Sequence, residues 1–143
     1  MMKSVYTKST WKGGMLVEGQ TSDHTLTIDQ PTDMGGEDAG PNPMEYLLIA
    51  LGSCLGSVAA ILAKQEGIDL REFSVEIDGE YDVEFLMGKT TQGRSGFTEI
   101  RETVHIEADM TDQEKAAFFE KVHLRCPATD NLYEQTPIVY EVK

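Results

Sequence analysis

One long apolar stretch, from Met44 to Ala63, constrains the fold of this chain more than any other feature of its sequence. Its length of about twenty residues is that of a membrane span. No basic cluster marks a cytoplasmic end, and small or polar residues interrupt the stretch at Glu45, Gly52, Ser53, Gly56 and Ser57. A helix that is apolar on nearly all sides is also typical of the buried centre of a domain or dimer. We therefore expect a buried helix here rather than a membrane span.

Both ends of this helix are marked in the sequence. Asn42 is a favourable N-cap residue, and Pro43 suits the first helical turn. Glu45 stands three residues after Asn42, as in a capping box. Gly67 is a natural C-terminal stop. The sequence thus predicts one helix from the Asn42 cap to about Gly67.

The residues before this helix have the pattern of strands. Thr, Val, Tyr and Trp are frequent from Ser4 to Trp11, and Gly13-Gly14 is a hairpin turn signal. The sequence predicts strands over Ser4–Trp11, Met15–Glu18 and His24–Asp29, followed by a loop over Gln30–Pro41.

The residues after the helix alternate between apolar and acidic. Apolar side chains from Phe73 to Phe85 fall on one face of a strand and carboxylates fall on the other. A partner strand marked by Ile100, Val104 and Ile106 makes an antiparallel hairpin around a loop over Met87–Gly96. We further expect a helix from Thr111, capped with Glu114, to about Val122, a short helix from Pro127, and a last strand over Ile138–Val142. Strands and helices are segregated, so the predicted fold class is α+β.

Length and charge limit the function. The chain has 143 residues, the size of one domain, and we expect a single domain over residues 1–143. Its 25 acidic and 12 basic residues give a net charge of −13. This charge repels phosphate backbones and anionic membranes, so we expect no nucleic acid and no membrane as partner. The N-terminus lacks the apolar core of a signal peptide, which predicts a cytoplasmic protein with reduced thiols.

The two cysteines are the main candidates for chemistry. Cys54 lies in mid-helix, where a buried thiol is more often a small hydrophobic residue and where a reactive thiolate needs a cationic neighbour. Cys126 precedes Pro127 and is a candidate N-cap, where aligned amides favour a thiolate. Arg125 and His123 are close in sequence. Simple packing of Cys126 is an equally good interpretation.

Other classes of site have little support. His24, His105 and His123 show no metal-ligand spacing, and nothing places a base beside Cys54 for a Cys-His hydrolase. The glycine-rich nucleotide motifs and the GxSxG esterase motif are missing. Small residues four apart, at Gly52, Ser53, Gly56 and Ser57, predict close helix packing against a symmetry mate, or a pocket beside Cys54.

Two segments resemble the OsmC/organic hydroperoxide resistance family. Gly40–Leu48 followed by Ala50–Cys54 is similar to the family's central helix, and Cys126-Pro127 is similar to its second cysteine motif. The Pro43-Met44-Glu45 pattern resembles a less characterised branch. The resemblance implies the OsmC-like α+β fold, with antiparallel sheets around a long buried central helix, and an intertwined homodimer.

The resemblance also implies thiol-dependent reduction of organic hydroperoxides in an oxidative stress response. Cys54 would attack the peroxide O–O bond and become a sulfenic acid, and Cys126 would condense with it to a disulfide. An external dithiol, often a protein-bound lipoyl group in this family, would restore both thiols. An apolar pocket would favour a small hydrophobic peroxide, and no metal or organic cofactor is needed.

Two positions depart from the family pattern. Peroxidases of the family use an N-terminal arginine to activate the attacking cysteine, whereas no arginine precedes Arg71 here. The family glutamate that holds this arginine directly follows Asn-Pro, whereas Glu45 comes one residue later, a helical rotation of about 100°. We expect Glu45 to be at most a supporting residue. The cation that replaces the family arginine and activates Cys54 is expected to come from Lys12, Lys89 or Arg94.

Two further functions stay open. A binding module could hold a hydrophobic small molecule in the dimer pocket, with the cysteines as lining. A redox sensor would oxidise but not turn over. A cation beside Cys54 would distinguish the peroxidase from both.

Overall fold

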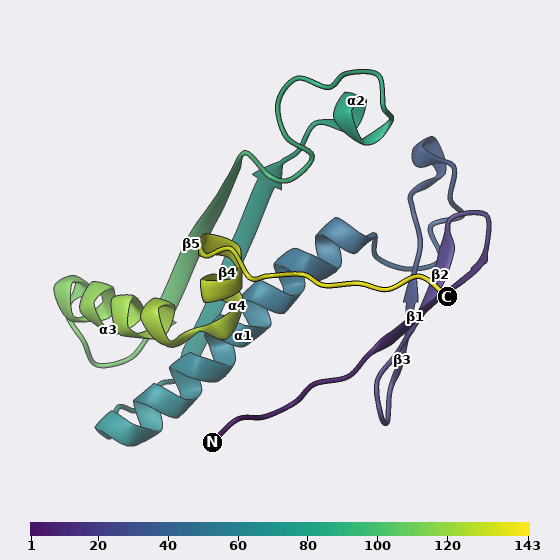
Figure 1. Cartoon of the computed structure of the whole chain (residues 1–143). Coiled ribbons are helices and arrows are strands. Elements are labelled where there is room, and N and C mark those ends of the chain that lie inside the picture. The colour runs from purple at the N-terminus through teal and green to yellow at the C-terminus, as the bar shows by residue number, and fades with distance from the viewer. The chain divides into compact units, whose positions relative to one another are not determined.

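The computed structural model describes residues 1–143, which form two compact units, Met1–Ile49 and Ala50–Lys143. Strands and helices are segregated and both sheets are antiparallel, so the predicted α+β class is confirmed (Figure 1). That residues 1–143 act as one domain stays a prediction, and each unit is described by itself below.

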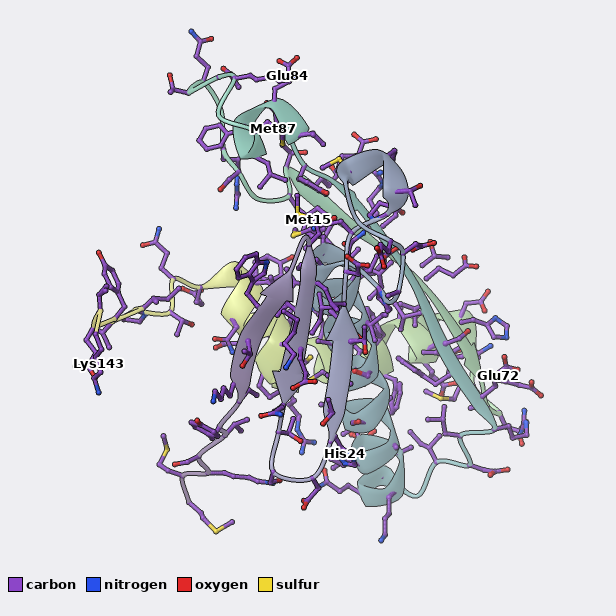
Figure 2. All side chains as sticks on the ribbon, turned by 90° about the vertical axis from the view of Figure 1, so that its right-hand side faces the viewer. Met15, His24, Glu72, Glu84, Met87 and Lys143 are labelled. Carbon is purple, nitrogen blue, oxygen red and sulfur yellow. The ribbon has the colours of Figure 1, made fainter.

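The first unit contains a three-stranded sheet of order β1-β2-β3, formed by β1 (Lys8–Gly13), β2 (Leu16–Gln20) and β3 (Thr25–Ile28). Three strands are found as predicted, although the first begins at Lys8 rather than Ser4. The hairpin turn uses positive φ angles of 108° at Gly13 and 55° at Gly14, which favour glycine. Met15 and His24 lie at opposite ends of this sheet (Figure 2).

A buried carboxylate organises the loop after β3, which includes the short 3₁₀ helix η1 (Thr32–Met34). Asp29 is 2% exposed and accepts hydrogen bonds from the amides of Gln30 (2.8 Å), Glu37 (3.1 Å) and Ala39 (3.2 Å). These bonds, the one from Ala39 above all, lower the pKa of the Asp29 carboxyl and outweigh its burial. The loop closes so tightly that a Cβ atom at Gly36 would lie 1.8 Å from the Gln30 carbonyl oxygen.

Helix α1 (Pro43–Glu66) begins and ends as the sequence predicts. The Asn42 side chain accepts from the amides of Met44 (2.9 Å) and Glu45 (3.0 Å), and Glu45 accepts from the Asn42 amide (2.8 Å). Gly67 follows with a φ of 69°. By length and hydropathy α1 could cross a membrane, a test that core helices of soluble proteins also pass. Its buried residues join the hydrophobic core, as those of a core helix do: Leu51, Leu55, Val58, Ala59, Leu62 and Ala63.

The second unit is built on the antiparallel pair β4 (Glu72–Glu80) and β5 (Glu99–Glu107), with helices α2 (Val83–Leu86), α3 (Asp112–Arg125) and α4 (Pro127–Tyr133) (Figure 1). One face of the pair packs with α1 and α3 around Leu55, Phe118 and Val122. The predicted Thr111–Glu114 capping box opens α3, which continues three residues past Val122.

One predicted strand is wrong at its end, and another is absent from the structure. The alternation through Phe85 does not make a strand beyond Glu80, because the Asp82 side chain accepts from the amides of Glu84 (2.8 Å) and Phe85 (3.3 Å) and caps α2. The residues from Ile138 to Val142 form no strand and are exposed. A strand needs a partner's backbone groups, and this segment has none within the chain.

Candidate functional site

The second unit brings the two cysteines together. Cys54 lies on α1 and is half-buried, whereas Cys126 is 1% exposed, and both are free thiols. Each thiol is among the groups that shift the pKa of the other, so the two lie near each other. Helix α1, with its capped N-terminus, positions Cys54. The junction between helices α3 and α4 positions Cys126.

Cys126 ends one helix and begins the next. It is the C-cap of α3 and the N-cap of α4, with Pro127 in the first turn of α4. Its amide donates to the His123 carbonyl oxygen (3.3 Å), and its own carbonyl oxygen accepts from the Asp130 amide (3.0 Å). The N-cap position of Cys126 is therefore as predicted. No linker separates the helices, which fixes the thiol against the core.

The surroundings of Cys126 favour its thiolate. Burial opposes ionisation, but the Thr129 hydroxyl, the Thr129 and Ala128 amides and the Cys54 thiol together lower the pKa of Cys126. Cys126 makes no side-chain capping bond, and the buried Thr129 hydroxyl has no hydrogen-bond partner. These donors are thus free to bind the sulfur once it carries charge.

The surroundings of Cys54 have the opposite effect. Burial raises the pKa of Cys54, and the hydrogen bond to Cys126 and its charge raise it further, against the Ala128 amide, which lowers it. No lysine or arginine is among the groups that shift this pKa. The pair therefore concentrates negative charge on Cys126.

The structure places the other predicted site residues as follows. Lys12 lies on β1 in the first unit, 3.9 Å from Glu18. Lys89 and Arg94 are exposed on the segment between α2 and β5. Glu45 serves the α1 capping box.

A pocket beside Cys54 was one of the predicted alternatives, and a cavity of about 370 Å³ borders residues next to both thiols. It is lined by Leu51, Phe97, Thr98, Glu99, Ile100, Glu102, His123, Thr129, Leu132 and Tyr133. The sequence does carry one signal for it, because Glu102 interrupts the apolar alternation of Ile100, Val104 and Ile106. No three His, Cys, Asp or Glu side chains gather where they could hold a metal ion.

The Thr129 hydroxyl gives a direct prediction for Cys126. In a Cys54→Ser background, which leaves one thiol to titrate, Thr129→Val removes a donor to the thiolate at nearly constant volume. We expect the pKa of Cys126 to rise, measured from thiolate absorbance against pH. Thr129→Ser keeps the hydroxyl and should leave the titration close to that of the background protein. Equal titration curves for the valine and serine variants would contradict this assignment.

Comparison with known proteins gives one family. The model of the OsmC family, described as OsmC-like protein, matches residues 35–141. An OsmC-like protein from Mycoplasma pneumoniae has a similar structure, with a TM-score of 0.81 at 21% identity over 94% of this chain and 91% of that one. No curated protein sequence matches.

Two more solved structures share the fold. An organic hydroperoxide resistance protein from Legionella pneumophila has a TM-score of 0.69 at 21% identity, covering 92% of this chain and 90% of its own. One from Elizabethkingia anophelis, with thiocyanate bound, has a TM-score of 0.73 at 19% identity, covering 94% and 91%.

Proposed function

This chain belongs to the OsmC family, and on that premise we propose that it is a thiol peroxidase that reduces organic hydroperoxides with Cys54 and Cys126. The observation that carries the proposal is the nearness of the two thiols in one core, one half-buried and the other enclosed. Relatives of the same fold named as organic hydroperoxide resistance proteins support the choice of substrate class.

The two thiols have different tasks in this reaction. Cys54, the more exposed, attacks the distal peroxide oxygen, the O–O bond breaks, and the alkoxide leaves and takes a proton to become the alcohol. The Cys126 thiolate then attacks the Cys54 sulfur, the S–O bond breaks, and hydroxide leaves and becomes water. One hydroperoxide and two thiols give one alcohol, one water and one disulfide. The lowered pKa of Cys126 suits this second step.

An external dithiol completes the cycle by reducing the disulfide, and a protein-bound lipoyl group has the required chemistry. A homodimer in the cytoplasm is part of the same proposal. Lys12, Lys89, Arg94 and Glu45 stay candidates for supporting Cys54, whose raised pKa calls for a cation in the reacting state.

A mass-spectrometric thiol count tests the proposal. Reduced protein receives one equivalent of cumene hydroperoxide or, in parallel, of hydrogen peroxide, with free cysteine as the rate standard. We expect rapid loss of two hydrogens, a Cys54–Cys126 disulfide in the peptide map, and a faster reaction with the organic peroxide. Oxidation no faster than that of free cysteine would contradict the peroxidase function.

The nearness of the two thiols also supports a second candidate, a redox sensor that oxidises once, because such sensors place a resolving cysteine beside the reactive one. Repeated additions of peroxide with dihydrolipoate present distinguish the two, because a peroxidase turns over and a sensor stops after one equivalent. A protein that does neither would be a binding module that uses the cavity.

A further inference from the structure

The cavity next to the thiol pair has a carboxylate in its wall at a position where a sheet face is normally apolar. Glu102 takes an inward register position on β5, between Ile100 and Val104 and opposite Ile77 of β4. Its side chain is 14% exposed. A carboxylate in such surroundings is unfavourable unless it is paired, so its presence calls for an explanation.

The cavity wall carries the Glu102 carboxylate but no lysine or arginine. Glu102 has one basic neighbour, His123 of α3, with 3.5 Å between His123 Nε2 and Glu102 Oε2. The imidazole is held in place by the rings of Phe119 and Tyr133, at centroid distances of 5.7 Å and 5.8 Å. Glu99 also borders the cavity, but it takes an outward register position on β5, and its carboxylate is 64% exposed and pairs with Arg101 (2.8 Å). The side chains that face the cavity therefore include the Glu102 carboxylate and one imidazole, and no lysine or arginine lines it.

The cavity extends to the neighbours of both thiols. Leu51 lies one turn before Cys54 on α1 and lines it. Thr129 also lines it, and this residue's hydroxyl is the donor that stabilises the Cys126 thiolate. A volume of about 370 Å³ with apolar walls from Phe97 and Leu132 is within the range of small-molecule sites, on the order of 300–1,000 Å³.

From this arrangement we propose that the cavity holds the organic part of the hydroperoxide, and that Glu102 makes it select organic groups without charge over those that carry a carboxylate. The inference rests on the proposed peroxidase function and names the substrate class within it. A second carboxylate next to Glu102 would be repelled, and the lining offers it no lysine or arginine. An uncharged aryl or alkyl group meets only the apolar walls.

The test compares cumene hydroperoxide with its para-carboxylate, two substrates that differ by one charge. The rate constant for forming the Cys54–Cys126 disulfide is measured in a single turnover, without reductant. The net charge of −13 repels every anion at long range, so the buffer contains 1 M NaCl, where the Debye length is about 3 Å. We expect the native protein to react at least about tenfold faster with the neutral peroxide.

Two variants test whether Glu102 causes the preference for the neutral peroxide. Glu102→Gln keeps the shape of the side chain and removes its charge, so the rate ratio should narrow severalfold. Glu76→Gln removes one charge from the exposed face of β4 and should keep the native ratio. Equal rates in the native protein, or a ratio that Glu102→Gln leaves unchanged, would overturn the inference and leave the peroxidase standing. Oxidation by neither substrate would instead overturn the proposed function and this inference with it.

Discussion

We expect replacement of Cys54 by serine to abolish the proposed reduction of organic hydroperoxides, with a loss of more than about a thousandfold, because serine cannot accept oxygen from a peroxide. Cys126→Ser has a different effect. The first oxidation proceeds, but Cys54 then stays as a sulfenic acid and advances to sulfinic acid when peroxide is in excess. Whole-protein mass spectrometry separates these outcomes, because Cys126→Ser gains oxygen, Cys54→Ser keeps its mass, and the native protein loses two hydrogens.

The two serine variants are matched controls for each other, because each removes one sulfur atom from the same contact. Circular dichroism checks that both are folded. If Cys126→Ser lost the first oxidation and Cys54→Ser kept it, the roles of the two thiols would be exchanged. That result would agree with their pKa directions but not with their exposure, since Cys126 is enclosed.

Leu62→Ala lowers the free energy of unfolding by about 2–5 kcal/mol, the range for deleting a buried leucine side chain. Leu62 is 4% exposed in the core of the second unit, two turns beyond Cys54 on α1. Urea unfolding followed by circular dichroism measures the change.

Leu124→Ala makes the same chemical change at a side chain that is 86% exposed, and should alter stability by no more than about 0.5 kcal/mol. Equal effects of the two variants would show that the surroundings of α1 differ from those described. A large effect of Leu124→Ala alone would indicate that this leucine is covered in solution.

Features that depend on neighbouring residues could be predicted from the sequence. Both capping boxes, Asn42 with Glu45 and Thr111 with Glu114, are present as expected, because each needs only residues three apart. The Gly67 helix stop is a local feature of the same kind. Local chemistry also overrode a periodic pattern, since Asp82 starts a helical turn where alternation predicts a strand.

Features that depend on distant partners were harder to predict. The segment from Ile138 to Val142 has strand composition but no partner within the chain. The contact between Cys54 and Cys126 was implied by the family resemblance and not by spacing. Glu102 was overlooked because the apolar residues on either side of it were enough to assign the strand. A carboxylate on the inward face of a strand was nevertheless a signal of a cavity.

The position of Cys126 at the junction of α3 and α4 has a thermodynamic consequence for regeneration. The proposed disulfide from there to Cys54 on α1 would enclose the whole β4–β5 hairpin and α3 in one covalent loop. Closing a loop of roughly 70 residues removes unfolded-state entropy equivalent to about 4 kcal/mol in the chain-entropy model. For a two-electron couple that is about 90 mV toward more negative potential. The disulfide would therefore have a more negative reduction potential and be harder to reduce. This favours a strongly reducing dithiol over a monothiol as the reductant.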